Sequence, residues 1–296
     1  MLIEMETLVV ILVLTILGLV CGSFAGAQVW RLRARQLRAD KRDGEEYDKR
    51  ELRTLDMLLK PKIANDRSRC LSCRHTLSAI DLIPLVSWLL TKGRCRYCRK
   101  PIGTFEPLIE VGAAAVFVSL FLCWPGDLAS GLEVTKLILW LIASIALIML
   151  FAYDVKWFLL PNILVAVTVV VGLAVSAITI SQATQPILAL TSIVYSVLIL
   201  SGIYAVLWGA SKGAWIGFGD VKLGLGLALL LADWRLAFIA LFAANAVGSL
   251  IVLPQLLIGR VSRTTRIPFG PLLIVGAYIA LWFGSHILQW YSGLLV

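Results

Sequence analysis

The stretch TKLILWLIASIALIMLFAYDVKWFLLPNILVAVTVVVGLAVSAITI, residues 135–180, decides the fold. It contains two long apolar runs, 135–153 and 157–180, separated by a short polar break that holds Asp154. An apolar run of about 20 residues is long enough to cross a bilayer as a helix. Two such runs in succession predict a pair of membrane-spanning helices.

The same pattern extends outward over the whole chain of 296 residues, of which 59% are hydrophobic and 15% are charged. A typical soluble domain has about 45–50% apolar and about 25% charged residues. This composition excludes a disordered protein, a secreted disulfide scaffold and an ordinary cytosolic enzyme. We expect an all-α polytopic membrane protein with about eight transmembrane helices, over residues 7–30, 106–124, 135–153, 157–180, 187–210, 220–232, 236–257 and 268–290.

The sixth of these spans, 220–232, differs from the others because it is short and contains Gly224 and Gly226. A helix too short for the bilayer is tolerated where neighbouring protein covers it. We therefore expect this span to be tilted, or partly buried in protein rather than in lipid.

The positive charge is concentrated in residues 31–105, which hold 19 of the 27 Lys and Arg and 9 of the 18 Asp and Glu. Basic loops resist translocation, so this segment is expected in the cytoplasm and the N-terminus outside. The charge therefore marks topology and indicates no nucleic acid partner. Three parts are expected: a first transmembrane helix at 1–30, a cytoplasmic cysteine-containing domain at 31–105 and a seven-helix membrane domain at 106–296.

Four cysteines in the basic segment form two Cys-x-x-Cys pairs. Each pair places two thiolates along one edge of a tetrahedron, and two pairs close a four-sulfur site typical of structural zinc. A reducing cytoplasm disfavours disulfides between them. Redox-active thiols and cysteines without a metal stay open as alternatives. The expected zinc ligands are Cys70, Cys73, Cys95 and Cys98.

Two aspartates lie at matching places in the predicted topology. Asp154 follows the third span, and Asp220 begins the sixth, so both fall at the cytoplasmic face. Ionisable groups at such a depth are costly and are functional candidates. Two facing carboxyl groups can share a proton, so that one acts as a base on water and the other as an acid. Either residue can instead cap a helix or pair with a neighbouring lysine, Lys156 or Lys222.

At this point the chain resembles the bacterial prepilin peptidases, which are type IV leader peptidases of the GxGD aspartic protease group. Residues 217–223 (GFGDVKL) match the family's G-x-G-D-x-K-L motif, and Leu160-Pro161-Asn162 follows Asp154 as in its D-x6-P-[DN] motif. The stretch 21–24 (CGSF), the double Cys-x-x-Cys and the stretch 267–271 (IPFGP) also match, in order, over nearly the whole chain. The resemblance implies that Asp154 and Asp220 are the catalytic dyad, supported by the motif residues Gly217, Gly219, Lys222, Pro161 and Asn162.

The resemblance implies two activities in the bacterial inner membrane. The first is cleavage of the basic leader from type IV prepilins and pseudopilins at the cytoplasmic face. The second, found in many members, is N-methylation of the new N-terminus with S-adenosylmethionine. Pro107 and Glu110 match a motif linked to methylation, but Phe105-Glu106 replaces its Arg-Tyr, which leaves this activity open. The individual substrate and the oligomeric state are not readable.

Two other classes of function remain open. A non-enzymatic membrane scaffold would use the cysteine segment as a zinc-ribbon docking module, and both aspartates would then be dispensable. A proton- or cation-coupled transporter would need acids along a path across the whole membrane, whereas both aspartates here lie near one face.

Overall fold

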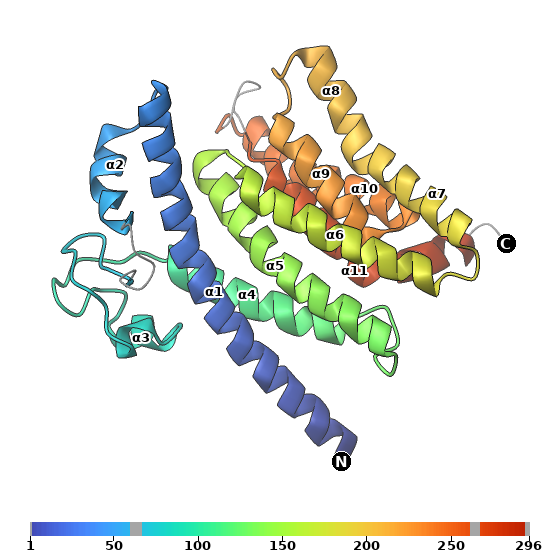
Figure 1. Cartoon of the computed structure of the whole chain (residues 1–296), viewed down its shortest axis with the longest axis horizontal. Helices are drawn as coiled ribbons and strands as arrows, with labels where there is room; N and C mark the ends of the chain where they lie inside the picture. Colours follow the sequence, from blue (N-terminus) through green and yellow to red (C-terminus); the bar gives the residue numbers. More distant parts are fainter. Residues whose placement is uncertain (1, 60–66, 261–266, 294–296) are drawn as a thin grey trace. The chain divides into compact units, whose positions relative to one another are not determined.

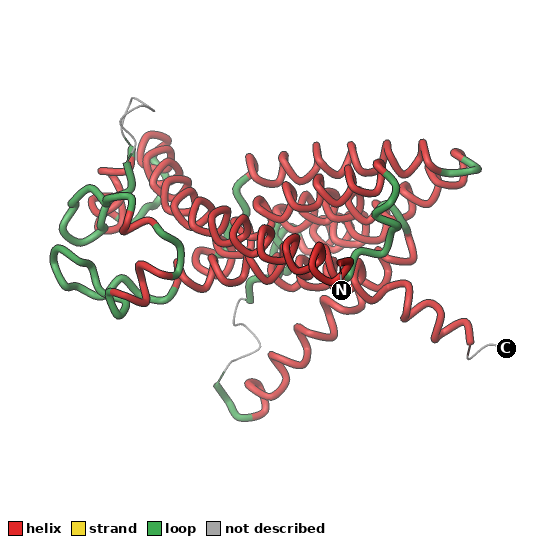
Figure 2. The backbone as a smooth tube through the Cα atoms, turned by 90° about the horizontal axis from the view of Figure 1, so that it is seen from below, coloured by secondary structure: helices red, strands yellow, loops and turns green. Residues whose placement is uncertain are grey.

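The computed structural model describes residues 2–59, 67–260 and 267–293, with side chains from Met5 onward. The described chain consists of helices joined by loops and contains no strand (Figures 1 and 2), which confirms the expected all-α fold. The helices are α1 (Leu2–Asp43), α2 (Lys49–Leu55), η1 (Asp56–Leu58), η3 (Ile80–Leu82), α3 (Val86–Leu90), α4 (Phe105–Leu122), α5 (Gly131–Trp157), α6 (Asn162–Gln182), α7 (Pro186–Val197), the π-helical η4 (Leu198–Gly202), α8 (Ile203–Ser211), α9 (Phe218–Leu231), α10 (Trp234–Leu257) and α11 (Gly270–Gly293).

Seven of the expected spans are helices that, among the described residues, are long and apolar enough to cross a membrane. They are α1, α4, α5, α6, the continuous run from α7 to α8, α10 and α11. The eighth expected span is α9, whose 14 residues are about 21 Å long, shorter than a hydrocarbon core of about 30 Å. Most residues of α9 are buried against neighbouring helices, as the sequence predicted.

The break between the third and fourth spans lies later than expected. Helix α5 continues to Trp157 and ends where Phe158 adopts a left-handed conformation, with φ of 56°. The chain then runs without helix to Pro161, and α6 begins at Asn162 rather than at residue 157. A proline fixes its own φ and disfavours helix in the residue before it, so the helix restarts only after Pro161.

Helix α9 is held by close backbone contacts and by serine hydroxyl groups. A side chain at Gly224 would meet the carbonyl oxygen of Leu200 in η4, so only glycine allows this approach. Three hydroxyl groups donate hydrogen bonds to α9 carbonyl oxygens at 2.7–3.0 Å: Ser176 to Leu229, Ser196 to Ala228 and Ser201 to Val221. Small residues and hydroxyl groups are the usual means by which membrane helices pack closely.

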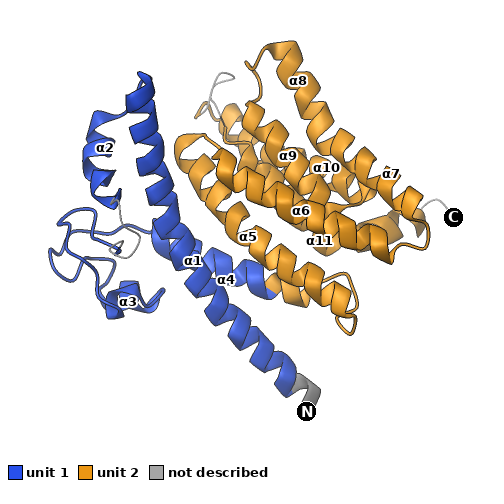
Figure 3. Cartoon of the chain, in the orientation of Figure 1, with its two compact units in different colours: residues 1–118 blue, residues 119–296 orange. Residues whose placement is uncertain are grey.

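The chain divides into two compact units, residues 1–118 and 119–296 (Figure 3). The division falls within α4, whose first part belongs to the first unit. The three-part functional division expected from the sequence, at residues 30 and 105, stays a prediction.

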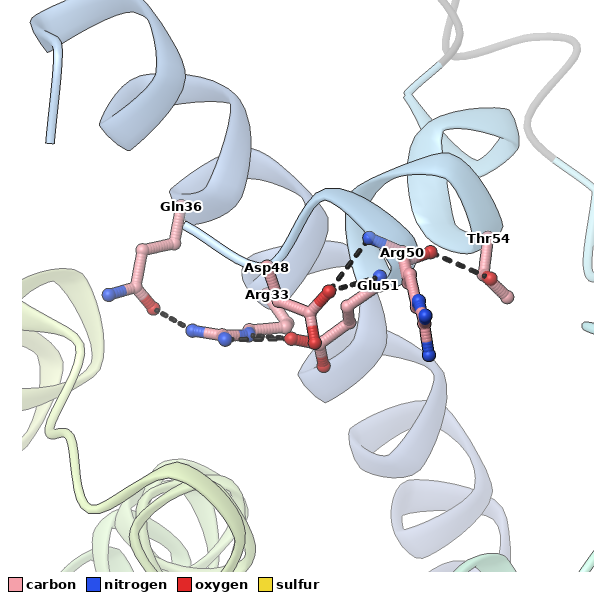
Figure 4. A network of polar contacts seen from close by, with 6 residues as sticks. All are labelled: Arg33, Gln36, Asp48, Arg50, Glu51 and Thr54. Carbon is pink, nitrogen blue, oxygen red and sulfur yellow. Dashed lines mark hydrogen bonds and ion pairs between the residues drawn. The ribbon is translucent and has the colours of Figure 1, made fainter. Parts of the chain in front are cut away.

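In the first unit, α2 packs on the second half of α1. Arg33 of α1 forms a partly buried salt bridge with Glu51 of α2 at 2.7 Å (Figure 4). Asp48 caps α2 by accepting hydrogen bonds from the backbone N–H groups of Arg50 and Glu51. Beneath these polar contacts lies a small apolar core formed by Ala34, Leu37, Leu52 and Leu55. The basic segment therefore begins as a continuation of the first span, with a second helix folded back on it.

Helix α4 approaches α1 at two glycines. A side chain at Gly18 would lie 2.6 Å from the Cα atom of Ala114, and one at Gly22 would lie 2.6 Å from the Cα atom of Glu110. Two helix backbones can come this close only where a side chain is missing. The CGSF stretch is thus a packing surface between α1 and α4.

Candidate functional site

The structure brings Asp154 and Asp220 together in the second unit. Asp154 lies in the last turn of α5 and Asp220 in the first turn of α9, and the two residues are only 5% and 9% exposed. The two carboxyl groups lie close enough for the charge of one to act on the other. Burying two acids with no cationic partner among the described residues is costly, which is typical of a functional site.

The late proline-rich stretch supplies a third side of this site. The backbone N–H of Gly270 donates a hydrogen bond to Oδ2 of Asp154 at 3.0 Å. A side chain at Gly270 would lie 2.8 Å from the same oxygen, so the glycine leaves room for the carboxyl group. The match to the family's P-F-G-P motif indicated this stretch, but its role as a hydrogen-bond donor was not predicted.

Leu160 lies between the two aspartate segments. A side chain at Gly219 would lie 3.1 Å from the Cβ atom of Leu160, and one at Gly270 would lie 3.2 Å from its Cδ2 atom. The turn before α6 therefore fills the space between the start of α9 and the start of α11. Gly219 is needed here for close approach to this turn.

The other motif residues support the site from its edges, and of these Gly217 contacts the carboxyl group of Asp220 directly. Lys222 donates a hydrogen bond from Nζ to Oδ1 of Asn162 at 2.9 Å, which links α9 to α6. Pro161 ends the turn before α6, and Gly217 is the residue before α9. The backbone N–H of Gly217 donates a hydrogen bond to the carboxyl group of Asp220. Asp220 therefore also caps the start of α9, which was the alternative interpretation of this aspartate.

This arrangement suits acid–base chemistry on a peptide bond. Two buried carboxyl groups that interact cannot both ionise cheaply, so the pair can share one proton. One carboxylate can accept a proton from water while the other donates its proton to a carbonyl oxygen. The sequence predicted this pairing from matched depth in the membrane.

The four cysteines of the first unit also come together. Their sulfur atoms all lie within 4.8 Å of one another, with Cys70 Sγ and Cys98 Sγ at 4.0 Å. Ligands at about 2.3 Å around a tetrahedral zinc ion stand about 3.8 Å apart, so the cluster fits a metal ion of this kind. Each pair folds as the same turn, because Arg74 and Arg99, the residues that follow, both have a positive φ, at 62° and 61°.

The four thiols differ in acidity. Burial raises the pKa of Cys70 to about 12. Burial opposes ionisation of Cys95 too, but hydrogen bonds from the backbone N–H groups of Cys98 and Tyr97 lower its pKa to about 7. A positive ion at the centre would stabilise all four thiolates.

One side chain that the sequence did not single out ties the second cysteine turn to the segment between the two cysteine pairs. The carboxylate of Asp81, on η3, accepts hydrogen bonds from the backbone N–H and hydroxyl of Ser78 at 3.0 and 2.7 Å. It also accepts one from the hydroxyl of Tyr97 at 2.9 Å and pairs with Arg96 at 2.9 Å. Asp81 is the only acid between the pairs, which is the signal that could have indicated it.

The residues linked to methylation lie at the start of α4. Glu110 is buried and accepts a hydrogen bond from the backbone N–H of Leu85 at 2.7 Å and another from Ser23. Pro107 is buried in the first turn of the same helix. Phe105 and Glu106, the two departures from the family's motif, both contact Trp30 of α1. In this chain they join α4 to α1.

Comparisons with known proteins agree with both halves of this description. Residues 16–124 match the bacterial peptidase A24 N-terminal domain, and residues 141–253 match the type IV leader peptidase family. A protein of Pseudomonas putida named prepilin leader peptidase/N-methyltransferase is 30% identical over 292 residues, which cover 96% of this chain and 94% of that protein.

Two further relatives are similar over most of their length. A protein of the same name from Aeromonas hydrophila is 31% identical over 237 residues, or 76% of this chain and 74% of the relative. An Escherichia coli O78:H11 protein named type 4 prepilin-like proteins leader peptide-processing enzyme is 31% identical over 268 residues, or 88% and 90%. No solved structure matches the chain. The two domain matches and these relatives establish that the chain belongs to the type IV leader peptidase family.

Proposed function

We propose that this protein is an aspartic endopeptidase that removes the basic leader from type IV prepilins and pseudopilins, with Asp154 and Asp220 as its catalytic pair. The observation that carries the proposal is the burial of these two interacting carboxyl groups at adjoining helix ends. The family supplies the substrate class, and the names of the relatives agree with it.

The reaction follows from the pair of carboxyl groups. One carboxylate takes a proton from a water molecule, whose oxygen attacks the carbonyl carbon of the scissile bond. The other carboxyl group gives its proton to the carbonyl oxygen, which forms a neutral tetrahedral intermediate. The carbon–nitrogen bond then breaks: the leaving amine takes a proton from the first carboxyl group, and a hydroxyl group of the intermediate returns its proton to the second carboxylate as the new carboxyl group forms. The hydrogen bond from Gly270 holds Asp154 in place, and the two roles belong to the pair jointly.

The substrate follows from the setting of the site. A prepilin has a basic leader followed by a hydrophobic helix, and a helix of this kind fits beside membrane-spanning helices. The spans carry many exposed large apolar side chains suited to lipid or to such a helix. We propose placement in the bacterial inner membrane with the N-terminus outside, and the cysteine cluster and both aspartates at the cytoplasmic side.

The metal ion of the cysteine cluster is proposed to be structural zinc. The donor set of four thiols fits zinc, and a closed set leaves no position for a substrate or water. The residues that would hold the ion are Cys70, Cys73, Cys95 and Cys98. Zinc would stabilise the segment 67–104, in which few residues are buried.

N-methylation of the new N-terminus is the second proposed activity, and it is supported by the names of the relatives. S-adenosylmethionine would supply the methyl group. The carboxylate of Glu110 already accepts two hydrogen bonds, so we assign it to holding the loop at Leu85 against α4 rather than to binding this cofactor. No described residue is assigned to the cofactor.

The test is mass spectrometry of a prepilin incubated with the purified protein and S-adenosylmethionine. Wild type should remove the leader, and Asp154→Asn and Asp220→Asn should not, while keeping the wild-type melting temperature. Asp233→Asn is the matched control, because Asp233 is an acid that caps α10 and pairs with Arg235. A further mass gain of one methyl group would establish the second activity.

Cleavage by both aspartate variants at the wild-type rate would refute the assignment. The scaffold interpretation would then be preferred, since it needs the cysteines and neither aspartate. Proton- or cation-driven uptake into vesicles that depends on the two aspartates, without any cleavage, would instead favour a transporter.

A further inference from the structure

Tyr204 of α8 is a buried polar side chain with no assigned role. It is 3% exposed, and its hydroxyl group has no hydrogen-bond partner of good geometry among the described residues. Asn245 lies near it: one of its two side-chain N–H groups donates to the carbonyl oxygen of Leu241 at 2.8 Å, and the other can donate to the Tyr204 oxygen, which still leaves the hydroxyl proton without an acceptor among the described residues. Buried hydroxyl groups are nearly always hydrogen-bonded, so an unpartnered one needs an explanation.

The surroundings of Tyr204 are those of the aspartate site. Its ring packs edge-on against the ring of Phe269, with centroids 5.3 Å apart. Phe269 directly precedes Gly270, whose N–H bonds to Asp154. Asp220 lies close enough for its charge to act on the tyrosine hydroxyl. The hydroxyl group is therefore near the second acid of the pair, while its ring rests on the segment that holds the first.

The backbone before Tyr204 explains how it reaches this position. The π-helical η4 inserts an extra residue into the run from α7 to α8, which rotates everything after it relative to a regular α-helix. Ser201, within η4, donates a hydrogen bond to the carbonyl oxygen of Val221, the residue after Asp220, at 2.9 Å. Tyr204 follows Ser201 by three residues, on the same face of the helix. The π-helix thus turns Tyr204 toward the start of α9.

We propose that Tyr204 is a positioning residue of the peptidase site, whose hydroxyl group donates a hydrogen bond to the Asp220 carboxylate when that group is ionised. The inference rests on the proposed function. A phenol is an effective donor to a carboxylate, and a hydrogen bond to an ionised acceptor is about twice as strong as a neutral one. This bond orients Asp220 toward the water or carbonyl oxygen that it serves, without contacting the substrate itself.

The test is steady-state cleavage of a prepilin by Tyr204→Phe, which keeps the ring on Phe269 and removes only the hydroxyl group. We expect kcat to fall about 10- to 100-fold, with KM and the melting temperature unchanged. Tyr278→Phe is the matched control: Tyr278 is also buried, but its hydroxyl donates to Ser144 of α5 at 2.7 Å. The control variant should keep the wild-type kcat.

A wild-type kcat for Tyr204→Phe overturns the inference. So does a fall in kcat that Tyr278→Phe shares, or one that comes with an equal loss of melting temperature, because the hydroxyl would then be structural. Asp154→Asn and Asp220→Asn are measured alongside. If both are inactive and Tyr204→Phe is normal, only this inference fails; if both cleave, the proposed function fails and this inference with it.

Discussion

Replacing Asp81 by alanine should weaken zinc binding about 30-fold while leaving all four cysteines in place. The Asp81 carboxylate holds the second cysteine turn, through Tyr97 and Arg96, to the segment between the two pairs at Ser78. Residues that orient metal ligands typically change metal affinity 10- to 100-fold when they are replaced. Because the metal-bound fold needs the second turn in one arrangement, the loss of these contacts makes zinc binding less favourable.

The magnitude follows from the individual contacts. A hydrogen bond such as that from Tyr97 contributes about 1 kcal/mol, and those from Ser78 contribute less because they are local. The Arg96 side chain is 44% exposed, so its ion pair is discounted to about 0.5 kcal/mol. Together these contacts contribute about 2 kcal/mol, which corresponds to about 30-fold in the dissociation constant.

The assay is competition for zinc between the purified protein and a chromophoric chelator of known affinity. Asp56→Ala is the control, because Asp56 is an exposed acid of the same unit that pairs with Arg38 at 2.6 Å, outside the cysteine turns. The reasoning is refuted if Asp81→Ala binds zinc as tightly as wild type, or if Asp56→Ala weakens binding to the same degree.

Two further predictions concern protons and packing. Zinc affinity should rise with pH near neutrality, because thiols must lose their protons to bind the ion. Burial raises the pKa of Cys70 to about 12, so this thiol still carries its proton at pH 7. Burial also opposes ionisation of Cys95, but hydrogen bonds from backbone N–H groups lower its pKa to about 7. Calorimetry in two buffers of different ionisation enthalpy should find more than one proton released per zinc at pH 7, and no release would contradict the thiol assignment. Gly224→Ala should cost about 1–3 kcal/mol and lower the melting temperature, because the new methyl group meets the Leu200 carbonyl oxygen. Gly209→Ala is the control and should keep the wild-type melting temperature, because its methyl group would meet nothing within 4 Å. Equal melting temperatures for the two variants would exclude the close contact between Gly224 and Leu200.

Much of the fold could be predicted from the sequence because each span is an uninterrupted apolar run. The turn from Phe158 to Pro161 and the π-helical η4 could not, for different reasons. The left-handed Phe158 is a single backbone conformation with no residue type that demands it. The π-helix depends on contacts of Ser201 and Leu200 with α9, which lies later in the chain.

The residues of the candidate site likewise include some that could be predicted from the sequence and some that could not. Asp154 and Asp220 could be found because acids are rare in apolar segments and topology places both at one face. The hydrogen bond from Gly270 could not be derived, since a backbone N–H is common to nearly all residues and leaves no pattern. Asp81 was missed because a lone acid in a charged loop looks like an ordinary surface residue until the fold brings Tyr97 and Arg96 to it.

The unbroken helix α1 makes the chain sensitive to insertions and deletions in a way that a loop would not. Its 42 residues extend about 63 Å, roughly twice the thickness of the hydrocarbon core. One residue gained or lost between the span and Arg33 would rotate the part beyond it by about 100°. Ala34, Leu37 and the helix α2 that packs on them would then rotate together relative to Gly18 and Gly22, the residues at which α1 contacts α4. Evolution can therefore vary the sequence of this helix more freely than its length.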